Sequence, residues 1–371
     1  MSTFQDILIA KILANINNNF EVNPDLWYAN SNYTIRKNIK IGNFKDRLVQ
    51  RNVGKYYCSK RDLEQLLANI FDNGSQHYEF LYNLLADQQS KDTLIEIVAF
   101  RLLGPKKIQL SIENDSYKSI HELISNSIIE RDYQKLEHYP RWSLHKFDLS
   151  SINMDLKIYY STMGIVTTFG VEQYRYKHLD IAPKEGATIL DCGGCWGDTA
   201  LYFDRKVKNA KIFTFEFVPS NIELLNTNLA LNNIHSVEVI EQPVGKISGS
   251  VYHVVDKGPS STLSDTPSEG SFEVETISID DLVVSKAIGK VDFIKMDIEG
   301  AELIALEGAR ETILKYSPTL VLAIYHYPCD FDQLPRFIHD LNPDYRFYLG
   351  HNTPHQDETV LFACVKENLP K

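Results

Sequence analysis

The spacing of apolar residues divides the chain into two parts. Over residues 1–142 apolar side chains recur at intervals of three and four, which predicts amphipathic helices and a mainly helical N-terminal domain. The stripes are Phe4, Ile7, Leu8, Ile12, Leu13 and Ile16; Leu63, Leu66, Leu67, Ile70 and Phe71; and Leu81, Leu84 and Leu85. Such stripes usually pack into a core, and a dimer contact through the first helix is the alternative.

Residues 143–371 have a different pattern, in which short apolar runs alternate with helical segments. The run LKIYYSTMGIVTTF predicts a short antiparallel lead-in within residues 144–170. The predicted strands after Pro183 are residues 188–190, 211–216, 236–241, 291–297 and 319–325, followed by YRFYLG and TVLFACV. The predicted helices begin at Asp198 and continue with PSNIELLNTNLALNN, EGAELIALEGARETIL and FDQLPRFIHDL. This order predicts an α/β domain with a mostly parallel sheet covered on both faces, an antiparallel terminal pair and an inserted hairpin or loop at 246–280.

Composition narrows the class of protein. The chain has 371 residues, of which 43% are hydrophobic and 23% charged, as in soluble globular proteins. A formal net charge of −11 argues against a general nucleic-acid binder, because such proteins need a basic face. We find neither an apolar run of membrane-spanning length nor a secretory leader, and the five cysteines do not form a disulfide framework. We therefore expect a cytoplasmic protein with no integral membrane segment.

The candidate chemistry centres on the stretch ILDCGGCWGDTALYF, residues 189–203. Asp191 ends the first strand of the α/β part, and Gly193, Gly194 and Gly197 follow before a helix that opens near Thr199. Glycines allow the backbone to turn tightly and to approach a ligand, and the amino terminus of the helix offers unpaired N–H groups. The pattern predicts a binding turn for a small-molecule cofactor at the carboxyl edge of the sheet.

A second acid indicates which kind of cofactor the turn binds. Cys195 and Asp198 replace two glycines of the dinucleotide fingerprint, and no phosphate-loop lysine follows. Glu216 ends the next strand, where a carboxylate can accept hydrogen bonds from ribose hydroxyls. Turn and acid together predict an adenosine-containing cofactor and leave S-adenosylmethionine and a nicotinamide both open.

Cys192 and Cys195 have a C-x-x-C spacing that also occurs in metal and redox sites. A metal site needs two further ligands, and no second pair is present in the sequence. A Gly-Gly centre is unusual for a thioredoxin-like motif. We interpret the cysteines as small side chains within the cofactor turn, and we assign no metal ligands here.

The motifs together resemble those of the FkbM-type S-adenosylmethionine-dependent O-methyltransferases. The resemblance rests on LDCGGCWGDTALYF, FEFVPSNIELLNTNLALNN and VDFIKMDIEGAELIALEGA in that order, and it covers about 150–365. It implies the Rossmann-like class I fold, a seven-stranded, mostly parallel sheet with an antiparallel terminal strand. Two features depart from the family: Phe217 stands where a proline is usual, and the turn contains cysteines.

The resemblance also implies a set of cofactor contacts. The methionine end would lie against the turn, Glu216 would bind ribose, and Phe217 and Gln242 would contact adenine. Gln173 and Tyr174, in the lead-in FGVEQY, would close over the cofactor. The predicted set is Gln173, Tyr174, Asp191, Gly193, Gly194, Gly197, Thr199, Glu216, Phe217 and Gln242.

Methyl transfer to a hydroxyl needs positioning and a group that helps to remove the proton. Asp297 and His326 follow strands at the carboxyl edge and are the candidate catalytic residues; a histidine can act there without a large pKa shift. Their alternatives are a helix-capping carboxylate and a strand-end histidine bonded to a carbonyl. Asp297 with Glu299 could bind a divalent ion, which two acids do not establish, and Glu302 is interpreted as structural.

The last loop contains His351, His355, Asp357 and Glu358, and a solvated hairpin tip is favoured over a metal cluster, with His351 a candidate to face the substrate. The expected acceptor is a small molecule or saccharide, such as a sugar in a surface-glycan precursor or a nucleotide-sugar. A nicotinamide-dependent oxidoreductase and a non-catalytic methyltransferase-fold partner protein are the competing hypotheses. The sequence leaves homo-oligomerisation open.

Overall fold

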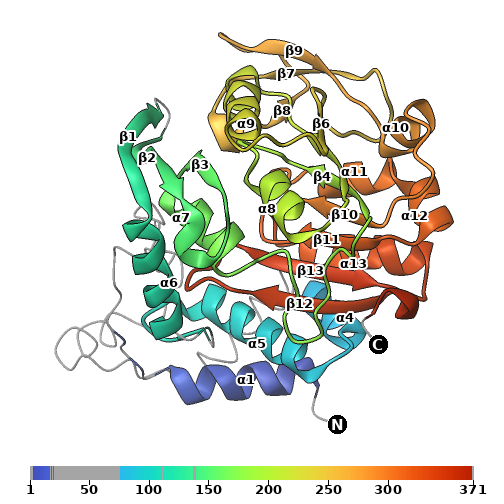
Figure 1. The fold of residues 1–371 in the computed structure, drawn as a ribbon. Coiled ribbons are helices and arrows are strands. Elements are labelled where there is room, and N and C mark those ends of the chain that lie inside the picture. Colours follow the sequence, from blue (N-terminus) through green and yellow to red (C-terminus); the bar gives the residue numbers. More distant parts are fainter. Residues whose placement is uncertain are drawn as a thin grey trace.

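The structure, a computed structural model, describes residues 3–16, 18, 20, 76–110, 112, 114–136 and 139–369. Within these ranges the chain forms a large sheet with helices on both faces, two smaller antiparallel sheets and a set of N-terminal helices (Figure 1). The predicted stripe from Leu63 to Phe71 lies outside the described residues.

The large sheet has seven strands in the order β12–β13–β11–β10–β4–β5–β6. Their bounds are β4 Thr188–Cys192, β5 Lys211–Phe215, β6 Val237–Ile240, β10 Phe293–Met296, β11 Thr319–Ala323, β12 Arg346–His351 and β13 Thr359–Cys364. β13 pairs antiparallel with β11 and β12, whereas β11, β10, β4, β5 and β6 pair in parallel. The predicted fold class is confirmed. The terminal pair forms the predicted antiparallel edge, in which β13 lies between β11 and the edge strand β12.

Alternation along the central strands supplies a separate core to each face of the sheet. Ile189 and Phe293 belong to one core, and their neighbours Leu190 and Ile294 belong to the other. Successive side chains of a strand point to opposite faces, so a strand that is buried on both faces is apolar throughout. Lys295 is the exception in β10, and it is almost fully buried.

Helices connect the parallel strands and cover the sheet. Their bounds are α8 Asp198–Lys206, α9 Pro219–Leu231, α10 Ile279–Ser285, α11 Glu302–Glu307, α12 Arg310–Tyr316 and α13 Asp330–Leu341. The segment EGAELIALEGARETIL, predicted as one helix, forms the two helices α11 and α12. The break falls at Gly308, where a Cβ atom would lie 2.1 Å from the carbonyl oxygen of Gly245, so the close backbone approach leaves no room for a side chain.

The N-terminal helices are α1 Phe4–Asn15, α4 Gln76–Leu84, α5 Gln88–Leu103 and α6 Asn114–Asn126. Of these, α5 packs against β12 with α1 and α4 beside it, whereas α6 contacts the segment 162–170 (Figure 1). α1 begins at a capping box between Thr3 and Asp6 and buries Phe4, Leu8 and Ile12, which confirms the predicted stripe apart from the exposed Leu13. α1, α4 and α5 share one hydrophobic core with the sheet. The division into domains at 142/143 stays a prediction.

The two small sheets flank the large one. β1 Ile128–Leu136, β2 Tyr139–Asp148 and β3 Lys157–Tyr160 form an antiparallel sheet, which confirms the first part of the predicted lead-in. Its second part is helical, as α7 Thr162–Ile165 and a π-helical turn Val166–Gly170, because Ser161 caps the helix and accepts from the Gly164 N–H. The predicted insertion at 246–280 contains β7 Val251–Val254, β8 Leu263–Ser264 and β9 Phe272–Glu275. The 3₁₀ turns are Leu149–Ile152, Gly258–Ser260 and Lys366–Asn368.

Candidate active site

The predicted glycine turn connects β4 to α8 at the carboxyl edge of the sheet. The N–H groups of Gly193 and Gly194 donate to the carbonyl of Phe215, at 3.2 and 2.8 Å, which fastens the turn to β5. Gly193 has a φ of +90°, and a Cβ atom on it would lie 2.0 Å from the carbonyl oxygen of Asp297. The turn and the segment after β10 are therefore in backbone contact, which only glycine permits at this position.

Asp191 lies beneath the turn and points into the protein. Its Oδ2 atom accepts from the hydroxyls of Thr199 and Thr214, at 2.7 and 3.0 Å, and its Oδ1 atom is 3.2 Å from Nζ of Lys295. The same Nζ donates to the carbonyls of Gly193 (2.7 Å) and Cys192 (3.2 Å). Asp191 is fully buried, and Thr199 nearly so. Any contribution of these two side chains to ligand binding is therefore made through the shape of the turn.

Lys295 is a site residue that the sequence analysis missed. Burial lowers the pKa of Lys295, but the carboxylates of Asp191, Asp297 and Asp198 outweigh this effect, and its pKa is raised above the ordinary value. The ammonium group therefore stays charged between the turn and Asp297. The available signal was a lysine inside the apolar strand FIKM, where an unpaired charge is not tolerated.

Glu216 follows β5 and lies in a ring of donors. Its Oε1 atom accepts from the N–H groups of Phe217 and Val218, at 2.7 and 2.8 Å, and its Oε2 atom from the amide of Asn221 at 3.3 Å. Burial outweighs these hydrogen bonds and raises the pKa of Glu216 to about 7. Ionisation of this carboxylate therefore changes across the neutral range.

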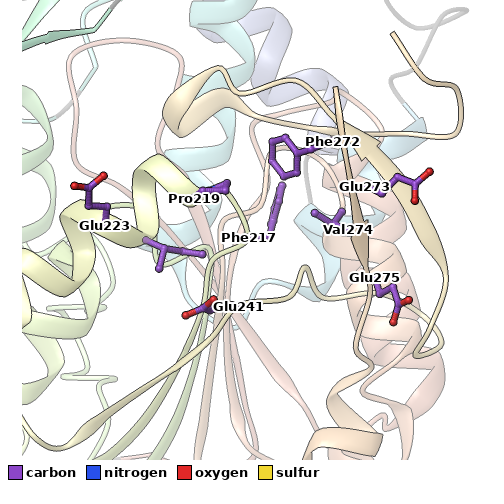
Figure 2. Close-up of a pocket in the computed structure, with 9 residues that line it drawn as sticks. Phe217, Pro219, Glu223, Glu241, Phe272, Glu273, Val274 and Glu275 are labelled. Atoms are coloured by element: carbon purple, nitrogen blue, oxygen red, sulfur yellow. The ribbon is translucent and has the colours of Figure 1, made fainter. Parts of the chain in front are cut away.

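An open hollow of about 500 Å³ is lined in part by Phe217, the residue that follows Glu216 in the chain (Figure 2). It is lined by Phe217, Pro219, Ile222, Glu223, Glu241, Phe272, Glu273, Val274 and Glu275. Phe217 is thus on its wall, while Gln242 turns toward the hairpin, where its amide donates to the carbonyl of Glu275 at 3.3 Å. Glu241, its neighbour, faces the hollow instead.

The lead-in residues Gln173 and Tyr174 contact acids beyond the glycine turn. The Tyr174 hydroxyl donates to Oδ2 of Asp297 at 2.8 Å, and the Gln173 amide donates to Oε2 of Glu358 at 2.8 Å. Both side chains are almost fully buried, and the Tyr174 ring centroid is 5.2 Å from Nζ of Lys295. This segment therefore links the floor of the turn to Asp297.

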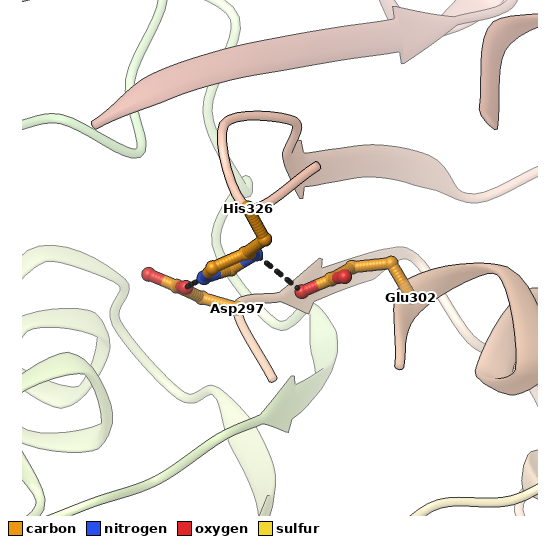
Figure 3. A group of neighbouring side chains, drawn as sticks. All are labelled: Asp297, Glu302 and His326. Carbon is orange, nitrogen blue, oxygen red and sulfur yellow. Dashed lines mark ion pairs between the residues drawn. The ribbon is translucent and has the colours of Figure 1, made fainter. Parts of the chain in front are cut away.

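Asp297 and His326 come together after the adjacent strands β10 and β11 (Figure 3). The Nε2 atom of His326 is 3.4 Å from Oδ1 of Asp297, and its Nδ1 atom is 3.2 Å from Oε1 of Glu302. These are ion-pair distances, but neither contact has the alignment of a hydrogen bond. Tyr325 contributes a hydroxyl 3.2 Å from Oδ1 of Asp297.

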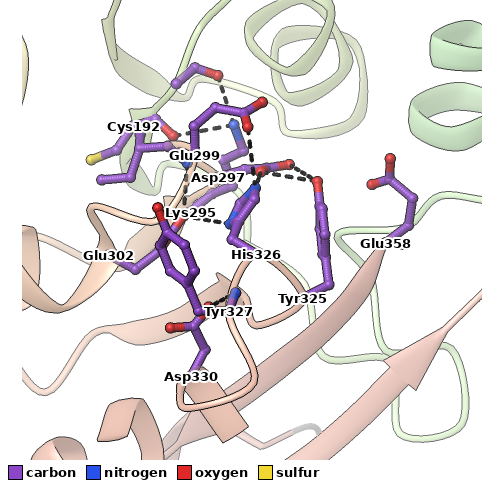
Figure 4. A network of polar contacts seen from close by, with 12 residues as sticks. Cys192, Lys295, Asp297, Glu299, Glu302, Tyr325, His326, Tyr327, Asp330 and Glu358 are labelled. Carbon is purple, nitrogen blue, oxygen red and sulfur yellow. Dashed lines mark hydrogen bonds and ion pairs between the residues drawn. The ribbon is translucent and has the colours of Figure 1, made fainter. Parts of the chain in front are cut away.

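The charges around His326 correct one expectation (Figure 4). Burial alone would lower the pKa of His326, but Glu302, Asp297 and Glu299 together raise it to about 9. The expected ordinary histidine pKa is therefore wrong for this arrangement. Glu299 is itself shifted, because burial and the charge of Asp297 raise its pKa to about 7.

The last loop is not the solvated tip that the sequence favoured. His355 is buried and His351 is half-buried, and desolvation lowers their pKa values to about 4 and about 3. His351 contacts the hydroxyls of Thr359 and Thr353, which occupy both ring nitrogens. Three potential metal ligands do come together elsewhere in the described part of the chain. They are Asp297, Glu302 and His326, whose donor atoms lie within 4.8 Å of one another.

The two cysteines of the turn differ in environment. Cys192 is fully buried at the end of β4, and Cys195 is half-buried with a φ of +44°. Both thiols are free, and burial raises the pKa of each. The hydroxyl of Tyr160 lies 3.9 Å from Sγ of Cys195.

Comparison with known proteins finds a family match over part of the chain. Residues 185–353 match the Methyltransferase FkbM domain. Methyltransferase 1 of Beauveria bassiana is 26% identical over 156 residues, which is 36% of this chain but only 62% of that protein. Methyltransferase sdnD of Sordaria araneosa is 25% identical over 195 residues, covering 43% of this chain and 75% of that protein.

A solved structure aligns with a larger share of the chain. Methyltransferase FkbM from Methylobacillus flagellatus KT aligns with 81% of this chain and 60% of its own, at 21% identity and a TM-score of 0.48. None of the helices in the described part of our chain is long and apolar enough to cross a membrane. Residues 185–353, which contain both the glycine turn and the Asp297–His326 pair, are thus similar to the Methyltransferase FkbM domain.

Proposed function

We propose that the protein is an S-adenosylmethionine-dependent O-methyltransferase that acts on a hydroxyl of a small molecule or saccharide. The observation that carries the proposal is the contact between the glycine turn and Asp297. β4 and β10 are neighbours in the sheet, and the Asp297 N–H donates to the carbonyl of Cys192 at 3.1 Å. A cofactor bound at the turn would therefore lie next to the candidate base.

The residues beside the turn fit the nucleoside end of this cofactor. Glu216 offers carboxylate oxygens of the kind that accept from ribose hydroxyls, and Phe217 gives the adjoining hollow an aromatic wall. S-adenosylmethionine, when bound, supplies an electrophilic methyl group on a sulfonium. The protein then has to hold the acceptor oxygen in line and remove its proton.

Asp297 is the residue best placed for that proton, with His326 as its neighbour. The hydroxyls of Tyr174 and Tyr325 donate to the Asp297 carboxylate from two elements and fix its orientation. Burial and the charge of Asp297 raise the pKa values of Glu299 and Glu358 to about 7 and about 8, so a further negative charge is unfavourable in this surrounding. This favours an uncharged sugar hydroxyl over a phosphate next to the reacting oxygen. A sugar of a surface-glycan precursor, methylated in the cytoplasm, fits this surrounding best.

Cofactor choice is tested by calorimetry of the purified full chain with S-adenosylmethionine and, separately, with NADH. We expect binding of the former only. Gly193→Ala should abolish it, because the new Cβ would lie 2.0 Å from a backbone oxygen. Gly289→Ala is the matched control, since nothing lies within 4 Å of a Cβ there. Binding of NADH alone would support the oxidoreductase instead.

The reaction is tested with methyl-labelled S-adenosylmethionine against a panel of glycan precursors and free sugars. Asp297→Asn should lower turnover by about 10²–10⁴-fold, the usual contribution of general acid–base catalysis. Cofactor binding without transfer to any acceptor would favour the non-catalytic partner hypothesis. Unchanged turnover in Asp297→Asn would remove that residue from the proposed role.

A further inference from the structure

The donor atoms around Nε2 of His326 have the spacing of a metal site. Nε2 is 3.4 Å from Oδ1 of Asp297 and 3.9 Å from Oε2 of Glu299. Ligand atoms roughly 2.1 Å from one metal ion stand about 3.0 Å apart when adjacent and about 4.2 Å apart when opposite. Both observed distances fall within this interval. Among the residues that the structure describes, the three whose donor atoms all lie within 4.8 Å of one another are Asp297, Glu302 and His326, so Glu299 completes the site only when its partly exposed carboxylate moves toward the ion.

The polar atoms of the cluster are also incompletely bonded. The side chain of His326 is only 8% exposed, yet neither ring nitrogen has an aligned hydrogen-bond partner. The Oε2 atom of Glu302 is likewise buried without a partner, in a residue that is 1% exposed. Buried polar groups of this kind call for a bound ion or another ligand to explain them.

We propose that Asp297, Glu299 and Nε2 of His326 bind one divalent cation, and that Glu302 positions the histidine. A metal takes the lone pair of Nε2, so the ring proton must lie on Nδ1. Glu302 faces Nδ1 at 3.2 Å, and its own Oε1 atom is anchored by the Ile298 N–H at 2.9 Å. A carboxylate behind a metal-binding histidine commonly fixes its tautomer in this way.

The donor set indicates the class of metal. Two carboxylates and one imidazole combine hard oxygen with nitrogen, which suits Mn²⁺ and leaves Mg²⁺ as a weaker competitor. Glu299 is more than one third exposed and can move its carboxylate toward the ion, whereas the two tyrosine hydroxyls hold Asp297 in place. If the proposed function holds, the cation would lower the pKa of the acceptor hydroxyl and so assist its deprotonation.

The site is tested by adding Mn²⁺ to the EDTA-treated full chain. Binding is measured as the loss of the electron paramagnetic resonance signal of free Mn²⁺. We expect one Mn²⁺ per chain, and at least tenfold weaker binding in Asp297→Asn, Glu299→Gln and His326→Gln. Glu302→Gln should weaken binding by about 10–100-fold, the usual effect of losing such a supporting partner. Glu307→Gln, in α11 but paired with Lys246, should bind as the unmodified chain does.

Two results would overturn the site. One is the absence of Mn²⁺ binding up to about 1 mM in a chain with native circular dichroism. The other is binding that is unchanged in the Asp297 and His326 variants. If Glu302→Gln lost Mn²⁺ binding and Glu299→Gln kept it unchanged, the assigned ligand set would be overturned. The measurement uses neither methyl donor nor acceptor, so its failure is distinct from a failure of the proposed function.

Discussion

Two buried polar clusters adjoin β10, and they differ in how completely their atoms are bonded. Under the glycine turn, Oδ2 of Asp191 accepts from Thr199 and Thr214, and Oδ1, the atom of this side chain without an aligned hydrogen bond, lies 3.2 Å from the ammonium of Lys295. Beyond the strand, His326 and Glu302 retain buried atoms without aligned partners. The ammonium of Lys295 lies against Oδ1 of Asp191 and also donates to two carbonyls of the turn, so this network rigidifies the structure around it. The second cluster leaves more buried atoms without an aligned partner, and such atoms call for something else to complete them. The first cluster therefore shapes the turn, and the second is open to a ligand.

The largest expected effect comes from exchanging one acid in each cluster. Asp191→Ala should lower the free energy of unfolding by about 3–5 kcal/mol, because it leaves the buried Lys295 without its partner. Asp297→Asn should change it by less than about 1 kcal/mol, since Asp297 lies among other acids and its loss relieves repulsion. Urea denaturation followed by circular dichroism measures both. Equal losses in the two variants would end the distinction between a structural and a ligand-binding cluster.

The sequence predicted the fold more fully than the site, for a physical reason. Strand and helix periodicity reflect burial along one segment at a time, and the strands of the large sheet were predicted within a few residues of their observed bounds. The helical segment 162–170 was predicted as a strand, because its β-branched residues favour that state until the Ser161 cap is considered. The break at Gly308 depends on a distant backbone atom and has no local signal.

The site residues illustrate the same limit. Asp191, Glu216, Asp297 and His326 could be found because each directly follows, or ends, an apolar strand. Lys295 and Tyr325 were missed, and Glu358 was assigned to a solvated loop tip, since their importance lies in contacts between distant segments. The lack of aligned hydrogen bonds around His326 and Glu302 also depends on side-chain angles, which no spacing in the sequence encodes.

A smaller effect concerns Glu216, on the cofactor side. Burial raises its pKa to about 7, so the carboxylate is ionised above this pH and protonated below it. Ribose hydroxyls donate to the ionised form, and S-adenosylmethionine should therefore bind more weakly as the pH falls from 8 to 6, by up to about tenfold. Calorimetry across this range measures the change. Glu216→Gln should bind weakly at every pH, and a pH dependence that survives in this variant would assign it to another group.

The smallest effect is expected for the cysteines, which test whether the turn works through its backbone. Cys192→Ala/Cys195→Ala should preserve the dissociation constant of S-adenosylmethionine within about threefold, because the turn is held by the Phe215 carbonyl and by Lys295 and not by the thiols. Removing the buried Sγ of Cys192 leaves a small cavity, so the free energy of unfolding should fall by about 1 kcal/mol. Alanine tolerates the positive φ of residue 195 no worse than cysteine does. Loss of cofactor binding by a variant that stays folded would show that a thiol contacts the ligand. Side chains of the turn, and not only those around Asp297 and His326, would then contact the reactants directly.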